Sequence, residues 1–157
     1  MSAGRPTKAD LIAELGLAFR RDQNRAQAFD ELAADRLGIN LTDLRCMDIV
    51  EQHGGLTAGE LAAAAHLTTG AVTAVLDRLE DAGYARRVSD PDDRRRVRVE
   101  LTAKAQRATG EIWGPAAEAY FSLFDRYTVE QLEGMLDLLG RSAAVQARLL
   151  ESLENGG

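Results

Sequence analysis

Apolar residues recur with two different periods along this chain. From residue 7 to 37 they return every three or four positions, as on one face of an amphipathic helix, and the spacing continues from 42 to 53. The helical spacing reappears after residue 102, and the segment after Thr128 has an apolar stripe broad enough to pack against two neighbouring helices. Between residues 84 and 101 the period is two, which is typical of short strands with one buried face. The pattern predicts a mainly α-helical chain with one small β-hairpin.

Residues at the ends of the long segments refine their boundaries. Gly38 should end the first helix, which would be about 45 Å long and would need a partner to cover its apolar face. Thr42 is predicted to cap the next helix, and Thr128 forms a capping box with Gln131 at the start of the last one. Because a proline removes a backbone donor, Gly114–Pro115 predicts a kink or a break in the last helix but one.

Residues 56 to 102 predict a more compact arrangement. Thr57 and Glu60 form a capping box that starts one short helix, and His66 occupies the turn after it, where histidine tolerates a left-handed backbone. Thr68 or Thr69 can cap a second short helix, and Gly83 would end it. The inward face of this helix would carry Val72, Val75, Leu76 and Leu79. Two short helices joined by a tight turn and followed by a hairpin outline a winged helix-turn-helix, a DNA-binding module.

The outward face of the second short helix carries candidate DNA contacts. Its first turn is small and uncharged, which suits a helix N-terminus inserted into the major groove, where hydroxyls meet base edges and backbone N–H groups meet phosphates. The alternative is that the threonines only cap the helix and fill space. The candidates on this face are Thr68, Thr69, Gly70, Thr73, Ala74 and Arg78.

The hairpin concentrates arginine. Strands at 84–88 and 96–101 flank the turn residues 89–93, and Arg94 to Arg96 complete the tip. Between residues 84 and 98, six arginines and three aspartates give a local charge of +3 in a chain whose net charge is −6. Attraction to phosphate acts over about 8–10 Å at ordinary ionic strength, so a basic tip on an acidic body can still bind DNA, with arginine entering the minor groove. The alternative is a solvated charged loop.

The tip and the helix-turn-helix also carry a specific set of residues. Asp93-Arg94-Arg95 leads through Val97 and Val99 into Leu101-Thr102, and Leu61-Ala62, Leu67, Val72-Thr73, Asp77-Arg78-Leu79-Glu80, Gly83 and Arg87 precede them at matching positions. In these residues the stretch resembles the MarR family of bacterial transcriptional regulators, whereas the helical remainder fits the family in layout only. Relatives often carry a basic residue where this chain has Ala74, so base readout from that position would depart from the family pattern.

The resemblance implies a DNA-binding homodimer. It implies that Arg95 enters the minor groove and that Asp93 orients it, and Arg87 joins Arg94 and Arg96 in the predicted DNA-binding set. It also implies a small aromatic or phenolic ligand in a crevice bounded by the first, second and fifth helices. Candidate lining residues are Phe19, Met47, Trp113 and Tyr120, with simple core packing as the alternative for each.

Other chemistry has few candidates. Cys46, the single cysteine, excludes an intrachain disulfide and is predicted to be buried filler and not a redox sensor. His53 and His66 have no cysteine or carboxylate at ligand spacing, so we predict no metal site and no cofactor. The sequence has no nucleophile elbow, phosphate-binding glycine loop or HExxH motif, which argues against an enzyme. Without a long apolar run or a secretory signal, we expect a cytoplasmic protein with no membrane partner.

These observations predict three segments in one chain. Residues 1–37 form an N-terminal dimerisation helix, 41–102 the winged helix-turn-helix DNA-binding domain, and 103–157 the C-terminal dimerisation helices. The predicted function is a sequence-specific transcriptional regulator, a repressor that binds an inverted repeat in double-stranded DNA and is released by a small aromatic ligand. The alternative is a winged-helix protein interaction module that does not bind DNA, and the arginine in the hairpin favours the first function.

Overall fold

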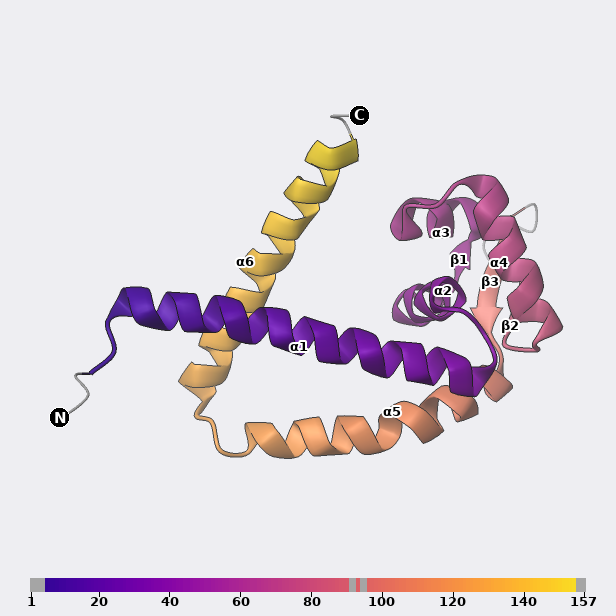
Figure 1. Cartoon of the computed structure of the whole chain (residues 1–157). Helices are drawn as coiled ribbons and strands as arrows, with labels where there is room; N and C mark the ends of the chain where they lie inside the picture. Colours follow the sequence, from indigo (N-terminus) through magenta and orange to yellow (C-terminus); the bar gives the residue numbers. More distant parts are fainter. Residues whose placement is uncertain (1–4, 91–92, 94–95, 155–157) are drawn as a thin grey trace. The chain divides into compact units, whose positions relative to one another are not determined.

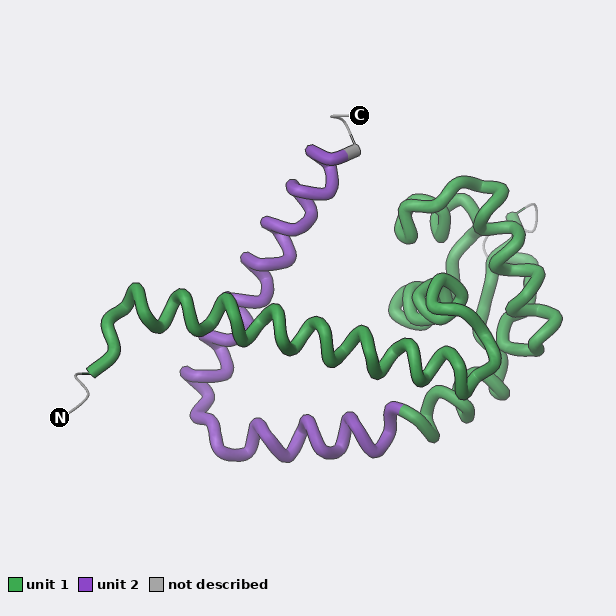
Figure 2. The backbone as a smooth tube through the Cα atoms, viewed as in Figure 1, with its two compact units in different colours: residues 1–112 green, residues 113–157 purple. Residues whose placement is uncertain are grey.

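The computed structural model describes residues 5–90, 93 and 96–154. These residues form six helices and a three-stranded antiparallel sheet (Figure 1), in the order α1 (Lys8–Leu37), α2 (Leu41–Gln52), β1 (Leu56–Thr57), α3 (Ala58–Ala65), α4 (Thr69–Asp81), β2 (Ala85–Ser89), β3 (Val97–Leu101), α5 (Ala103–Phe124) and α6 (Val129–Glu154). The predicted fold class, mainly α with a small β-wing, is confirmed. The chain divides into two compact units, residues 1–112 and 113–157 (Figure 2).

The winged head, residues 41–102, is built around α4. The helix α4 packs against α2, α3 and β2, and β3 packs against α2 (Figure 1). The apolar positions of α4 that recur at helical spacing all point into this core, and the opposite face of the helix remains exposed. The largest apolar side chains of the head that are almost completely buried are Met47, Val50, Leu61, Val72, Val75, Leu76, Leu79 and Val99.

The predicted caps of the helix-turn-helix are confirmed. Thr57 accepts a hydrogen bond from the backbone N–H of Glu60, whose carboxylate accepts one from the N–H of Thr57. His66 ends α3 with a left-handed backbone at φ 54°, and Thr68 caps α4 by accepting from the N–H of Ala71. Gly83 follows α4 at φ +74° and donates to the carbonyl of Glu80, a C-terminal motif that favours glycine because it has no Cβ. The turn between α3 and α4 is therefore fixed by local chemistry.

Two predicted features of the helices differ from the structure. Asn40 and not Thr42 caps α2: the Asn40 side chain accepts from the N–H of Asp43 at 2.9 Å, and asparagine is among the strongest N-cap residues. At Pro115, where a kink or a break is predicted, the helix does not break, because α5 runs from Ala103 to Phe124 with the proline inside it. The residue before Pro115 is a glycine, which has no Cβ to clash with the proline ring, so the helix loses one hydrogen bond without ending.

The sheet contains one strand more than the hairpin predicts. Its order is β1-β3-β2, with Leu56 opposite Val99 and Arg87 opposite Val99 on the other side. Both hairpin strands begin one residue later than predicted. Tyr84 instead precedes β2 as a buried side chain whose hydroxyl donates to the carbonyl of Leu37 at 3.0 Å. The short β1 therefore connects the wing to the start of α3.

The long helices expose much of their apolar surface. Among the described residues, every buried apolar side chain lies between Ala33 and Ala105. Large exposed apolar side chains lie on α1 (Leu11, Ile12, Leu15, Leu17, Phe19, Phe29, Leu32), on α5 (Tyr120, Phe121, Leu123, Phe124) and on α6 (Val129, Leu136, Leu138, Leu139, Val145, Leu149, Leu150, Leu153). Within the described part of the chain, none of the helices has the length and apolar character needed to cross a membrane.

Candidate nucleic-acid interface

The N-terminal half of α4 presents a small, uncharged surface. Thr69, Gly70, Thr73 and Ala74 are exposed, as is the capping residue Thr68. The hydroxyl of Thr73 donates to the carbonyl of Thr69 at 3.0 Å, a bond that leaves the oxygen able to accept from a ligand. A side chain at Gly70 would meet no atom within 4 Å, so the backbone there is open to a close approach. This surface fits the predicted recognition helix.

Arg78, predicted as a DNA contact on the same face, has a partner in its own chain. Its Nε and Nη2 donate to Asp43 Oδ2 and Oδ1 at 3.0 and 2.6 Å. The Asp43 side chain, in the first turn of α2, is only 2% exposed, whereas the Arg78 side chain is 48% exposed. The hydrogen bonds that Arg78 donates to Asp43 raise the pKa of Arg78 above its ordinary value. The pair thus joins α4 to α2, and Arg78 has a structural role that its sequence position does not reveal.

Arg87, on β2, is also engaged within the head. It forms ion pairs with Glu80 and Asp77 of α4, the latter at 2.9 Å between Nη2 and Oδ1. Its backbone N–H donates to Glu80 Oε1 at 3.0 Å. These bonds fix β2, the first strand of the wing, against the C-terminal half of α4.

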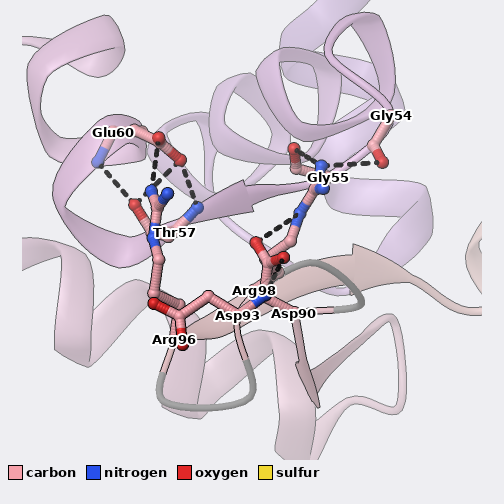
Figure 3. A network of polar contacts seen from close by, with 8 residues as sticks. All are labelled: Gly54, Gly55, Thr57, Glu60, Asp90, Asp93, Arg96 and Arg98. Atoms are coloured by element: carbon pink, nitrogen blue, oxygen red, sulfur yellow. Dashed lines mark hydrogen bonds and ion pairs between the residues drawn. The ribbon is translucent and has the colours of Figure 1, made fainter.

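Two further arginines anchor the wing on its other side (Figure 3). Arg96 Nη2 donates to Glu60 Oε1 at 2.9 Å, which links the wing to the first turn of α3. Arg98, on β3, donates from Nη2 to the carbonyl of Gly55 at 2.6 Å, and its Nε lies 4.0 Å from Asp90 Oδ2. Asp90 is buried, so the Arg98 contacts form the less exposed attachment.

The predicted tip residues are described only in part. The backbone N–H of Asp93 donates to Asp90 Oδ1 at 3.2 Å, and its carbonyl accepts from the N–H of Arg96 at 2.8 Å, which closes the turn. Arg94 and Arg95 lie outside the described residues. The prediction that Asp93 orients Arg95 therefore stays a prediction.

The four candidate ligand residues lie in different surroundings. Met47 is 1% exposed and belongs to the core of the head, which agrees with the core alternative, whereas Phe19 on α1 is exposed. Trp113 and Tyr120 belong to the other unit, residues 113–157, where Tyr120 is exposed. A groove of about 690 Å³, bounded by α1, the turn before α2 and the exposed face of α4, contains none of the four. The ligand site stays a prediction.

The structure shows the surroundings of Cys46, the single cysteine. The Cys46 side chain is fully buried, as predicted, and burial raises the pKa of its thiol, as does the neighbouring Asp43 carboxylate. The described residues hold no group of three or more histidine, cysteine or carboxylate side chains that could bind a metal ion.

Sequence reasoning missed the carboxylates that hold the arginines. Glu60 is predicted only as part of a capping box, and Asp43 has no predicted role, because their arginine partners are 36 and 35 residues away along the chain. The only signal was indirect: a hairpin rich in arginine and one arginine, Arg78, on the second short helix, within an acidic chain.

The chain is similar in sequence to known bacterial transcriptional regulators. Residues 39–97 match the MarR family. The chain is 37% identical over 150 residues to the uncharacterised HTH-type transcriptional regulator YcgE of Bacillus subtilis, covering 96% of this chain and 97% of the relative. It is 31% identical to the HTH-type transcriptional repressor Mb2911 of Mycobacterium bovis, covering 69% of this chain and 80% of the relative.

A solved structure shares the fold. It is a mutant of MepR from S. aureus bound to an oligodeoxyribonucleotide, with a TM-score of 0.57 and 21% identity, over 84% of this chain and 97% of that one. The family match covers the winged head, and the similarity to YcgE extends over nearly the whole chain. The relatives named here are transcriptional regulators, which favours DNA binding over the alternative of a protein interaction module. The chain belongs to the MarR family and is a DNA-binding transcriptional regulator.

Proposed function

We propose that the chain is a cytoplasmic, dimeric repressor that binds an inverted repeat in duplex DNA. The N-terminal half of α4, with Thr68, Thr69, Gly70, Thr73 and Ala74, would enter the major groove, and the tip of the wing, with Arg94, Arg95 and Arg96, the adjacent minor groove. A Mycobacterium bovis relative is named a repressor, which supports that mode of regulation.

The single observation that carries this proposal is the surface of α4. On the outward face of its first two turns the residues are exposed, small and uncharged, and these turns follow directly on a capped N-terminus. A helix end of this kind offers backbone N–H groups and hydroxyls to DNA without a large side chain in the way. Arg78 and Arg87, which pair with carboxylates of the head, would position this surface.

The wing contribution can be tested with Arg95→Ala. We expect it to weaken binding to a duplex selected from a random pool by about 1–3 kcal/mol. The logarithmic dependence of affinity on salt should become shallower by up to about 0.9, because one positive charge near the phosphates is removed. Arg141→Ala is the matched control, because Arg141 pairs with Asp137 within α6, far from the head in sequence.

Fluorescence anisotropy at several salt concentrations measures both quantities. Unchanged affinity of the Arg95→Ala protein would remove Arg95 from the interface. If the wild-type protein binds no duplex, or binds duplex with an affinity that does not depend on salt, the proposed function as a whole is refuted.

Dimerisation is supported by the exposed apolar surface of the long helices. On α6, Leu136, Leu149 and Leu153 are 69%, 58% and 76% exposed, and α1 and α5 carry similar residues. Exposed apolar surface of this extent marks an interaction site, and a second copy of the chain offers the same surface. Size-exclusion chromatography with light scattering should give twice the mass of one chain at micromolar concentration. A monomer under these conditions would contradict the proposal.

A small aromatic or phenolic effector that releases the DNA is the last part of the proposal. Its support is the family resemblance, with Phe19, Trp113 and Tyr120 as aromatic side chains that are not fully buried. A panel of phenolic acids should contain members that raise the melting temperature and lower DNA affinity together. If no compound in the panel changes either quantity, this part of the proposal loses its support.

A further inference from the structure

We propose that Glu60 competes with DNA phosphate for Arg96: it holds the Arg96 guanidinium in the free head and releases it to a backbone phosphate when the head binds duplex. This inference rests on the proposed function, in which Arg96 belongs to the DNA-binding wing. It gives Glu60 a role in DNA affinity beyond starting α3.

The two carboxylate oxygens of Glu60 have separate partners (Figure 3). Oε2 accepts from the backbone N–H and the hydroxyl of Thr57, at 2.8 and 2.9 Å, and so caps α3. Oε1 accepts from Arg96 Nη2 at 2.9 Å. Because the cap uses the other oxygen, Arg96 can leave without opening the first turn of α3.

The ion pair between Arg96 and Glu60 can be replaced by a pair between Arg96 and phosphate at little cost. The side chains of Arg96 and Glu60 are both 51% exposed, and an ion pair in this setting contributes little to stability. A guanidinium binds carboxylate and phosphate with the same planar arrangement of donors, so one anion can replace the other. The hydrogen bonds from Thr57 hold the pKa of Glu60 below its ordinary value, which keeps the competing carboxylate ionised.

The wing would keep its place after the exchange. Arg98 still binds the carbonyl of Gly55 and lies beside the buried Asp90, and Arg87 still pairs with Asp77. These contacts hold both strands of the wing independently of Arg96. Loss of the Glu60 contact therefore changes what Arg96 can bind and not where the wing lies.

The test is Glu60→Gln, which removes the charge but keeps a residue that completes a capping box. Affinity for the selected duplex should rise about two- to fivefold, the range that corresponds to an exposed ion pair. The matched control is Glu100→Gln: Glu100 pairs with Arg86 at 3.0 Å in the same head, and Arg86 is outside the predicted DNA-binding set. That control measures the general gain from removing one negative charge.

The Arg96→Ala background separates competition from a general charge effect. There, Glu60→Gln should give no more than the gain of Glu100→Gln, because the guanidinium for which Glu60 competes is gone. Thermal melts of each variant confirm that the fold is retained.

Three results would overturn the inference while leaving the proposed function intact. They are weaker binding of Glu60→Gln, a gain equal to that of Glu100→Gln, or a gain that persists in the Arg96→Ala background. Loss of duplex binding in the wild-type protein would instead refute the proposed function, and this inference with it.

Discussion

The pair between Arg78 and Asp43 gives the sharpest test of how the head is assembled. If Arg78 acts mainly by neutralising Asp43, Arg78→Ala should destabilise the protein even in the absence of DNA. If it acts mainly as a DNA contact, the same change should weaken DNA binding and leave stability unaltered.

The structure sets the size of the effect. Removing one partner of a fully buried ion pair costs about 3–5 kcal/mol, because a charge is left without compensation. Arg78 is half exposed but Asp43 is almost completely buried, and it accepts two hydrogen bonds from the guanidinium. We therefore expect a loss near the lower end of that range, about 3 kcal/mol, for Arg78→Ala. Adding Asp43→Ala should recover roughly half of the loss, since the stranded carboxylate is then absent.

Thermal unfolding measures these differences, and it is done at one fixed protein concentration because the stability of the proposed dimer would depend on concentration. For a chain of this length, about 3 kcal/mol corresponds to a fall of roughly 6–12 °C in melting temperature. A double variant less stable than Arg78→Ala, or a single variant within about 0.5 kcal/mol of wild type, would show that Asp43 does not depend on Arg78 for compensation.

Two further predictions concern the core and the turn after α4. Cys46 is fully buried and its thiol pKa is raised, so a thiol reagent at neutral pH should modify it only as fast as the protein unfolds. Rapid modification of the folded protein would contradict this. Gly83→Ala should cost about 1 kcal/mol of stability, because φ at this position is +74°. Gly70→Ala, at an open position in α4 with an ordinary helical backbone, is the control and should not destabilise the fold in the same thermal melts.

Local signals predicted the helix-turn-helix well. Thr57, His66, Thr68 and Gly83 act through bonds to residues at most five positions away, so their roles can be read from the sequence alone. The wrong choice at the start of α2 also came from local competition. Asn40 and Thr42 are both acceptable N-caps, and only the backbone conformation shows that Asn40 stands before the first turn.

Features that depend on contacts far apart in the chain were not predictable. Two residues of β1 have no strand signal of their own and become a strand only because β3 lies beside them. Pro115 is a different case, because it has a local signal for a break and the helix nevertheless continues through it. The partners of the arginines belong to the same class as β1, because a carboxylate gives no sign in the sequence of which guanidinium it faces.

These pairings change what the charge count means for DNA binding. The sequence gives the stretch from 84 to 98 a charge of +3, yet Arg86, Arg87, Arg96 and Arg98 each have a carboxylate partner in the same head. An arginine that already has a carboxylate partner attracts phosphate weakly at a distance and strongly only when the partner is displaced. Long-range attraction of this head to DNA should therefore be weaker than its arginine content implies, and binding should depend on close contacts in which a phosphate replaces a carboxylate. The head should therefore bind more tightly to duplexes whose shape places a phosphate in contact with the wing than to duplexes whose phosphates stay at a distance from it.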